Sequence, residues 1–145
     1  MEQSDSVTVK VLKDISKVSL NKELLQAIFE GARSLYPKEV ILLLRGRKRK
    51  NLIEITDLVV PPLANYGRGF ADIKLHMMPM DFSIMGTAHS HPSGNLNPSF
   101  TDLNHFLGIV LMITAYPFAD EKNVAVYNRD GEKLTLQTTE AQSKA

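Results

Sequence analysis

The chain alternates short apolar runs with turn-forming residues, and this alternation constrains the fold more than any other feature. Runs of strand length lie at 39–44, 52–60, 70–80, 83–91, 109–116, 124–127 and 134–138. Two further segments, 20–35 and 99–107, carry apolar residues at helical spacing instead. The order helix, strands, helix, strands predicts the α/β class, with a mixed β-sheet flanked by helices.

The first helix has clear sequence boundaries. Ser19 or Asn21 can serve as its N-cap, and Pro37 ends it because proline cannot continue a helix. A strand from Glu39 to Leu44 follows. Positions 45–50 then read RGRKRK and hold five of the 17 basic residues. Without those five the rest of the chain would carry +1 − 5 = −4, and we interpret this segment, the basic knob, as a solvated turn between strands.

Length and composition limit the class of protein. At 145 residues the chain is expected to form one domain, residues 1–145, with an ordered core at about 7–138. No apolar run approaches the roughly 20 residues that a membrane-spanning helix needs, so no membrane partner is expected. The chain has no cysteine, which excludes disulfides and thiolate metal sites and favours a cytoplasmic location.

Two of the four histidines stand one residue apart, at His89 and His91. In a strand, side chains at i and i+2 point to the same face, so both imidazoles can converge on one ion. Prolines and a glycine then force a turn that brings Asp102 back toward the histidines. Two nitrogens and one carboxylate leave a fourth tetrahedral position open, which is the arrangement of catalytic zinc.

A structural interpretation of the same residues competes with the metal site. Ser99 and Asp102 fit a capping box, with serine as N-cap and an acidic residue three positions later. At 100° per residue, Asp102 lies about 40° from Phe106 on a helical wheel, at the edge of the apolar side. This position predicts a carboxylate that faces inward. Capping and metal binding can therefore coexist at Asp102.

The stretch HSHPSGNLNPSFTD at 89–102 resembles the pattern of the JAMM (MPN-plus) metalloprotease family. That pattern is His, Ser or Thr, His, seven residues, Ser, two residues and Asp, and the spacing here matches it without a gap. The family also has an upstream glutamate in a P-x-E-x-x-G-x-L-x-G stretch, and Glu39 takes its place in PKEVILLLRG. Leu42 stands where the family has glycine. The likeness covers about residues 20–138 and is closest to the compact prokaryotic, archaeal-type members.

The resemblance implies a cytidine-deaminase-like JAMM/MPN fold and one zinc ion per chain, held by His89, His91 and Asp102. It also implies roles for two further residues. Glu39 takes a proton from water made acidic by zinc and passes it to the leaving amine, while Ser99 donates a hydrogen bond to the oxyanion. Deaminase activity is not expected, because nucleobase deaminases use cysteine ligands.

The implied function is that of an isopeptidase or peptidase. Its substrates would be conjugates of a ubiquitin-like modifier or sulfur-carrier protein, cleaved at a lysine amine or at a C-terminal extension. Two alternatives stay open at this point. RadC-like, nucleic-acid-associated proteins share an HNHPSG run, although Ser90 here replaces their asparagine, and the basic knob could meet phosphates. The other alternative is a non-catalytic MPN scaffold. Both alternatives are less favoured than the peptidase. Charge in a hairpin turn is usually solvated, which weakens the nucleic-acid alternative, and the scaffold is less favoured still because every ligand of the family pattern is present.

Overall fold

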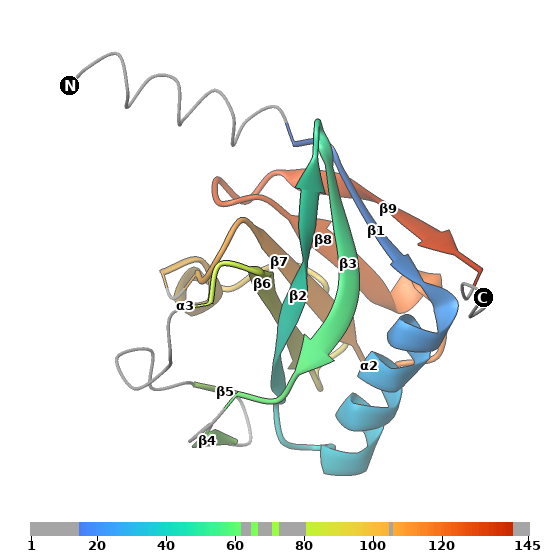
Figure 1. Ribbon diagram of the computed structural model, residues 1–145. Coiled ribbons are helices and arrows are strands. Elements are labelled where there is room, and N and C mark those ends of the chain that lie inside the picture. Colours follow the sequence, from blue (N-terminus) through green and yellow to red (C-terminus); the bar gives the residue numbers. More distant parts are fainter. Residues whose placement is uncertain (1–14, 62–64, 67–70, 73–80, 105, 141–145) are drawn as a thin grey trace.

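The computed structural model describes residues 15–61, 65–66, 71–72, 81–104 and 106–140 (Figure 1). Its elements are β1 Lys17–Asn21, α2 Lys22–Leu35, β2 Ile41–Arg49, β3 Leu52–Val59, β4 Asn65–Tyr66, β5 Ala71–Asp72, β6 Ile84–His91, α3 Phe100–Asn104, β7 Val110–Ala115, a 3-10 turn Glu121–Asn123, β8 Val124–Tyr127 and β9 Lys133–Thr139. Within this described part, no helix is both long and apolar enough to cross a membrane.

Seven strands form one mixed sheet that closes on itself in the order β1-β3-β2-β6-β7-β8-β9. β1 runs parallel to both of its neighbours, β3 and β9, and β6 runs parallel to β7. The remaining neighbours in this sheet are antiparallel. The mixed sheet with its helices confirms the predicted α/β class, while the likeness to cytidine deaminases stays a prediction. β4 and β5 form a separate two-stranded sheet.

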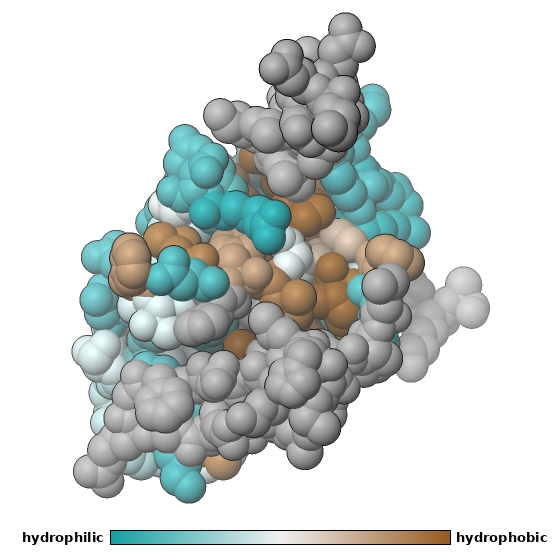
Figure 2. All heavy atoms as spheres, turned by 90° about the vertical axis from the view of Figure 1, so that its left-hand side faces the viewer, coloured by the Kyte–Doolittle hydropathy of each residue, from teal (hydrophilic) through white to brown (hydrophobic). Residues whose placement is uncertain are grey.

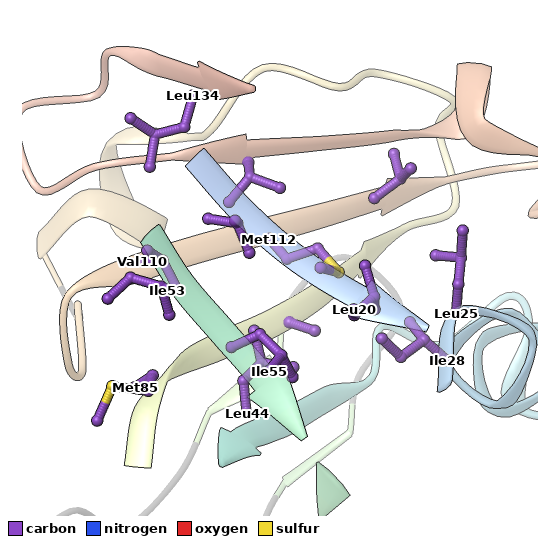
Figure 3. Packing of buried hydrophobic residues seen from close by; sticks show 14 of the residues in the cluster. Leu20, Leu25, Ile28, Leu44, Ile53, Ile55, Met85, Val110, Met112 and Leu134 are labelled. Atoms are coloured by element: carbon purple, nitrogen blue, oxygen red, sulfur yellow. The ribbon is translucent and has the colours of Figure 1, made fainter. Parts of the chain in front are cut away.

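Helix α2 begins after Asn21, one of the two caps that the sequence suggested. The Asn21 side chain accepts a hydrogen bond from the backbone N–H of Leu24 at 2.8 Å and so satisfies one of the helix's first free donors. One face of the helix is buried, through Leu25, Ile28, Phe29 and Ala32. Figure 3 shows Leu25 and Ile28 turned from the helix toward the strands, near Leu20. This contact packs α2 against the sheet.

The two faces of strands β7 and β8 bury different apolar clusters, because successive side chains in a strand point to opposite sides. Val110 and Met112 belong to the large cluster shared with α2 and most strands of the sheet (Figure 3). The opposite face carries a smaller cluster of Leu111, Ile113, Ala125 and Tyr127, against which Leu96, Leu103 and Phe106 pack. The segment that contains α3 therefore lies over this second face.

The basic knob is part of a strand rather than a turn, which corrects the sequence interpretation. β2 continues to Arg49, and only Lys50 and Asn51 form the turn. Antiparallel pairing with β3 extends the strand, and Glu54 of β3 pairs with Arg47 at 2.8 Å and with Arg49 at 3.6 Å. Partners on the neighbouring strand thus make an extended conformation favourable for a charged segment that looks like a loop in sequence.

Two further elements differ from the sequence prediction. β1 was not expected, because its five residues carry a short and irregular apolar pattern. The second helix, expected over 99–107, is only the five residues of α3, and its apolar first residue Phe100 is 82% exposed. In this short helix, Asp102 is the residue that is buried. Of the strand expected at 70–80, only 71–72 lies within the described residues.

Candidate metal centre

Strand β6 places His89 and His91 on the same side of the sheet, near the strand's C-terminal end. The strand is held between β2, where Ile41 is the partner of His89, and β7, where Ile113 is. Both residues are almost fully buried, with exposures of 5% and 8%. A central strand bonded on both sides leaves the two rings little freedom to move. The sequence pattern predicted this side-by-side placement.

Asp102 lies between the two histidine rings. Its Oδ1 is 3.2 Å from Nδ1 of His89, and its Oδ2 is 3.1 Å from Nε2 of His91. The carboxylate is 7% exposed, which confirms that Asp102 faces inward. The loop at 92–99 and the start of α3 return the chain to the strand that it has just left (Figure 1). Residues 11 to 13 positions apart in the sequence are thereby brought into direct contact.

Ser99 and Asp102 form the reciprocal capping box that the sequence suggested. The backbone N–H of Asp102 donates to Oγ of Ser99 at 2.9 Å, and the backbone N–H of Ser99 donates to Oδ2 of Asp102 at 2.8 Å. The cap fixes the Asp102 carboxylate as well as the helix start. Oγ of Ser99 accepts one bond here and keeps its own O–H as a donor, and the residue is exposed.

The donor set fits a zinc ion, although no three His, Asp or Glu side chains of the described residues already surround a metal-sized space. Nδ1 of His91 is 2.7 Å from the carbonyl oxygen of Asn95, which can only accept, so that nitrogen carries a hydrogen. In a neutral ring, Nε2 then presents a lone pair to a carboxylate oxygen at 3.1 Å. Two facing acceptors need a cation between them, either a proton or a metal ion. Nε2 of His89 is also buried without a hydrogen-bond partner, as a nitrogen available to a metal would be.

The electrostatics of the site favour a bound cation. Burial favours the neutral acid at Asp102, but hydrogen bonds from His89, His91 and Ser99 outweigh it and hold the carboxyl pKa well below its usual range. At His91, burial opposes protonation, but Asp102, the Asn95 carbonyl and the charge of Glu39 outweigh it and raise the pKa. The ring thus lies in a negative environment that is buried from water.

Glu39 precedes strand β2 at the same end of the sheet. Ser90, between the two histidines, binds the neighbouring residue Val40 twice: its N–H donates to the Val40 carbonyl at 2.9 Å, and its Oγ accepts from the Val40 N–H at 2.7 Å. The antiparallel register of β2 and β6, continued by two pairs beyond Ile41 and His89, sets Glu39 opposite His91. The negative charge of Glu39 also acts on His91. The structure therefore brings Glu39 to the site, half-buried.

Several residues that hold the site were not identified from the sequence. The hydroxyl of Ser90 fixes the backbone next to Glu39, and the sequence pattern gave no sign of this contact. The Asn95 carbonyl orients His91, and no side-chain pattern could reveal a backbone acceptor. Leu42, at the position where the resembled family has glycine, packs half-buried against the large core cluster. The larger side chain is accommodated without displacing β2 from β6.

The face that carries α3 in Figure 1 is turned toward the viewer in Figure 2. Apolar surface gathers near the middle of this face, with hydrophilic surface on its left and at its upper right. Phe100, next to Ser99, and Phe82 are among the large apolar side chains exposed on the described part of the molecule. Exposed apolar surface of this kind is typical of contact with another macromolecule.

The chain is similar in sequence to one protein family and to a named protein. Residues 21–133 match the family described as prokaryotic homologs of the JAB domain. A protein of Haloferax volcanii named a probable metalloprotease is 26% identical over 140 residues, covering 92% of this chain and 86% of the relative.

Solved structures agree with the sequence comparison. A structure described as "JAMM: A Metalloprotease-like Zinc Site in the Proteasome and Signalosome" is 33% identical, with a TM-score of 0.60 over 87% of this chain and 99% of that one. A JAB1/MPN domain protein from Archaeoglobus fulgidus is 34% identical, with a TM-score of 0.62 over 86% and 99%. A solution structure from Desulfitobacterium hafniense, with a TM-score of 0.63 over 87% and 95%, is 16% identical and supports the fold alone.

Proposed function

The chain belongs to the family of prokaryotic homologs of the JAB domain, and from that premise we propose that it is a zinc-dependent isopeptidase or peptidase. Its substrate is a ubiquitin-like modifier or sulfur-carrier protein joined through its C-terminus to a lysine amine or to a C-terminal extension. The metalloprotease class is supported by the relatives described above. The proposal goes beyond the metalloprotease class in naming the kind of modifier and the type of bond that is cleaved.

One observation carries the proposal: two buried imidazoles meet one buried carboxylate at 3.1 and 3.2 Å. Zinc is the cofactor, and we assign one ion per chain to His89, His91 and Asp102. When bound, zinc supplies a Lewis acid that makes water acidic near neutral pH. Three protein ligands are the number typical of catalytic zinc sites, whereas a purely structural site uses four.

Glu39 moves the proton in this proposal. A carboxylate next to the ligand set can accept a proton from water and deliver it to the departing amine, a role worth about 10²–10⁴ in rate. The double hydrogen bond between Ser90 and Val40 supports the role, because it fixes the backbone that carries Glu39. The role is also supported by the negative charge of Glu39, which helps to raise the pKa of His91, one of the proposed ligands.

Ser99 stabilises the oxyanion. Its Oγ accepts from the Asp102 N–H, so its orientation is fixed while its O–H stays available to donate. A donor aimed at developing negative charge is worth about 3–4 kcal/mol in the transition state. Phe100 extends the exposed surface beside it, which suits a protein substrate better than a small molecule.

The test combines metal content with a panel of substrates. Purified protein should contain one zinc per chain, and His89→Ala and His91→Ala should lose it while Glu39→Gln keeps it. The panel consists of ubiquitin-like proteins conjugated to lysine or extended at the C-terminus, each incubated with and without a chelator. Cleavage that the chelator abolishes and added zinc restores supports the proposal. Full zinc content in both histidine variants would contradict the ligand assignment, and zinc-loaded protein that cleaves nothing in the panel would contradict the substrate class.

A further inference from the structure

The loop at 92–99 controls the orientation of His91 through a single backbone atom. The ring's Nδ1–H donates to the carbonyl oxygen of Asn95 at 2.7 Å, which leaves Nε2 facing Asp102. Metal-binding histidines commonly have their other nitrogen held in this way, and the partner sets both tautomer and ring angle. The position of the Asn95 carbonyl is therefore a property on which zinc binding depends.

Local hydrogen bonds define the shape of this loop but not its place on the sheet. The Gly94 N–H donates to the carbonyl of His91 at 3.2 Å, where Gly94 has a φ of 85°. The Asn95 N–H donates to Ser93 Oγ at 3.3 Å, and the Asn97 N–H donates to Asn95 Oδ1 at 3.0 Å. Each bond joins residues two or three positions apart. Ser93, Gly94, Asn95 and Asn97 are all exposed.

Tyr127 of β8 makes a long-range hydrogen bond to Leu96, the residue after Asn95. Its hydroxyl donates to the carbonyl oxygen of Leu96 at 2.7 Å, across 31 positions of sequence. The tyrosine ring is 6% exposed and lies in the cluster against which the Leu96 side chain packs. Through its pairing partner Leu111, Tyr127 belongs to the same rigid sheet as the histidine strand. Burial raises the pKa of Tyr127, so its hydroxyl keeps the proton that it donates.

We propose that Tyr127 is a positioning residue for the metal centre: its hydroxyl fixes the Leu96 carbonyl and thereby holds the adjacent Asn95 carbonyl against Nδ1 of His91. The inference rests on the proposed zinc site and assigns Tyr127 no contact with metal or substrate. Loss of the hydroxyl should let the loop shift while the ring packing stays in place. His91 would then turn away from its ligating angle more often.

The experiment compares Tyr127→Phe with Tyr36→Phe, a tyrosine half-exposed after α2. Zinc affinity is measured by competition with a chromophoric chelator. Tyr127→Phe should bind zinc about tenfold more weakly, the lower end of the effect of removing an outer hydrogen-bond partner. Tyr36→Phe should match wild type. If Tyr127→Phe fails to fold, 4-fluorophenylalanine at position 127 fills the space of the hydroxyl without donating.

A second readout needs no metal. Imidazole ¹H–¹⁵N spectra of the zinc-free protein report the Nδ1–H of His91, and its exchange with water should be faster in Tyr127→Phe than in wild type. A purely structural role of Tyr127 would lower the melting temperature and leave this exchange unchanged. Unchanged zinc affinity together with an unchanged His91 spectrum would overturn the inference. Wild-type protein that binds no zinc would instead overturn the proposed function, and the ring spectra alone would then decide the role of Tyr127.

Discussion

Among single residues, Glu39 is the one whose substitution best distinguishes metal binding from proton transfer. Glu39→Gln keeps the shape of the side chain but cannot take up a proton, so we expect zinc content and fold to be retained. Turnover should fall by about a hundredfold or more, as for loss of a general acid–base group. Elemental analysis measures the zinc content, and steady-state kinetics measure the turnover. Asp102→Asn is the matched control, which should lose zinc, and turnover of Glu39→Gln within about threefold of wild type would contradict the role.

Ser99 has two functions that one substitution removes together. Ser99→Ala deletes the acceptor for the Asp102 N–H, which should lower the free energy of unfolding by about 1 kcal/mol. It also deletes the hydroxyl donor, so turnover should fall, though less than in Glu39→Gln. Ser99→Thr keeps cap and hydroxyl and serves as the control. Denaturant titration with kinetics separates the effects: lower stability with unchanged turnover would leave Ser99 as a cap alone.

Side-chain chemistry at the site could be predicted from sequence because it follows periodicity. The i, i+2 spacing placed His89 and His91 together, and the helical wheel turned Asp102 inward, where the structure has it. The supporting bonds could not be predicted, since they use backbone carbonyls of Asn95 and Leu96, whose positions depend on the loop. Sequence patterns record which side chains are present, whereas such acceptors exist at every residue.

At the scale of secondary structure elements, two glycines should respond to alanine in opposite ways. Gly31 lies in α2 with nothing within 4 Å of an added Cβ, so Gly31→Ala should stabilise the protein by about 1 kcal/mol. Gly108 precedes β7 with a φ of +86°, and a Cβ there would lie 2.5 Å from the carbonyl oxygen of Met85. Gly108→Ala should therefore destabilise by about 2 kcal/mol or more. Thermal melts of both variants test the pair, and equal shifts in one direction would contradict it.

Element boundaries were predicted well where the pattern is local. The Asn21 cap and strands β6 and β8 agree with expectation. The errors lie where distant partners decide: β2 continues through charged residues because β3 pairs with it, and β1 exists because β3 and β9 lie on its two sides. Closure of the sheet likewise depends on parallel pairs far apart in sequence. Periodicity within one segment carries no information on such pairing.

At the scale of the whole molecule, the basic knob and the metal centre lie at opposite ends of β2. Ile41 is paired with His89, and Arg49 is eight residues further on, about 26 Å along an extended strand. Arg45 pairs with Asp57 and Asp81, and Arg47 and Arg49 share Glu54. These carboxylates offset part of the charge that the nucleic-acid alternative required. The knob is thus remote from the chemistry, and any contribution it makes should be to encounter with an acidic partner.

Replacement of Arg47, Lys48 and Arg49 by serine tests this remoteness. Zinc content and turnover at saturating substrate should equal those of wild type, because the substitutions lie at the far end of β2. The Michaelis constant is expected to rise at low salt and to converge with wild type at high salt, where screening removes steering. Kinetics at two ionic strengths measure the turnover and the Michaelis constant. A collapse of turnover on a small uncharged peptide would show that the knob reaches the active site.

The position of β1 has a consequence for how the protein is made. Residues 17–19 pair on one side with 52–54, and residues 17–21 pair on the other side with 135–139. A growing chain can form the first pairing early, but the second must wait until β9 has left the ribosome. Until then one side of β1 presents unpaired backbone groups that can capture a strand of another chain. Release of the last strand is therefore the step that seals the sheet, and nascent chains stalled before Lys133 should aggregate where full-length chains do not.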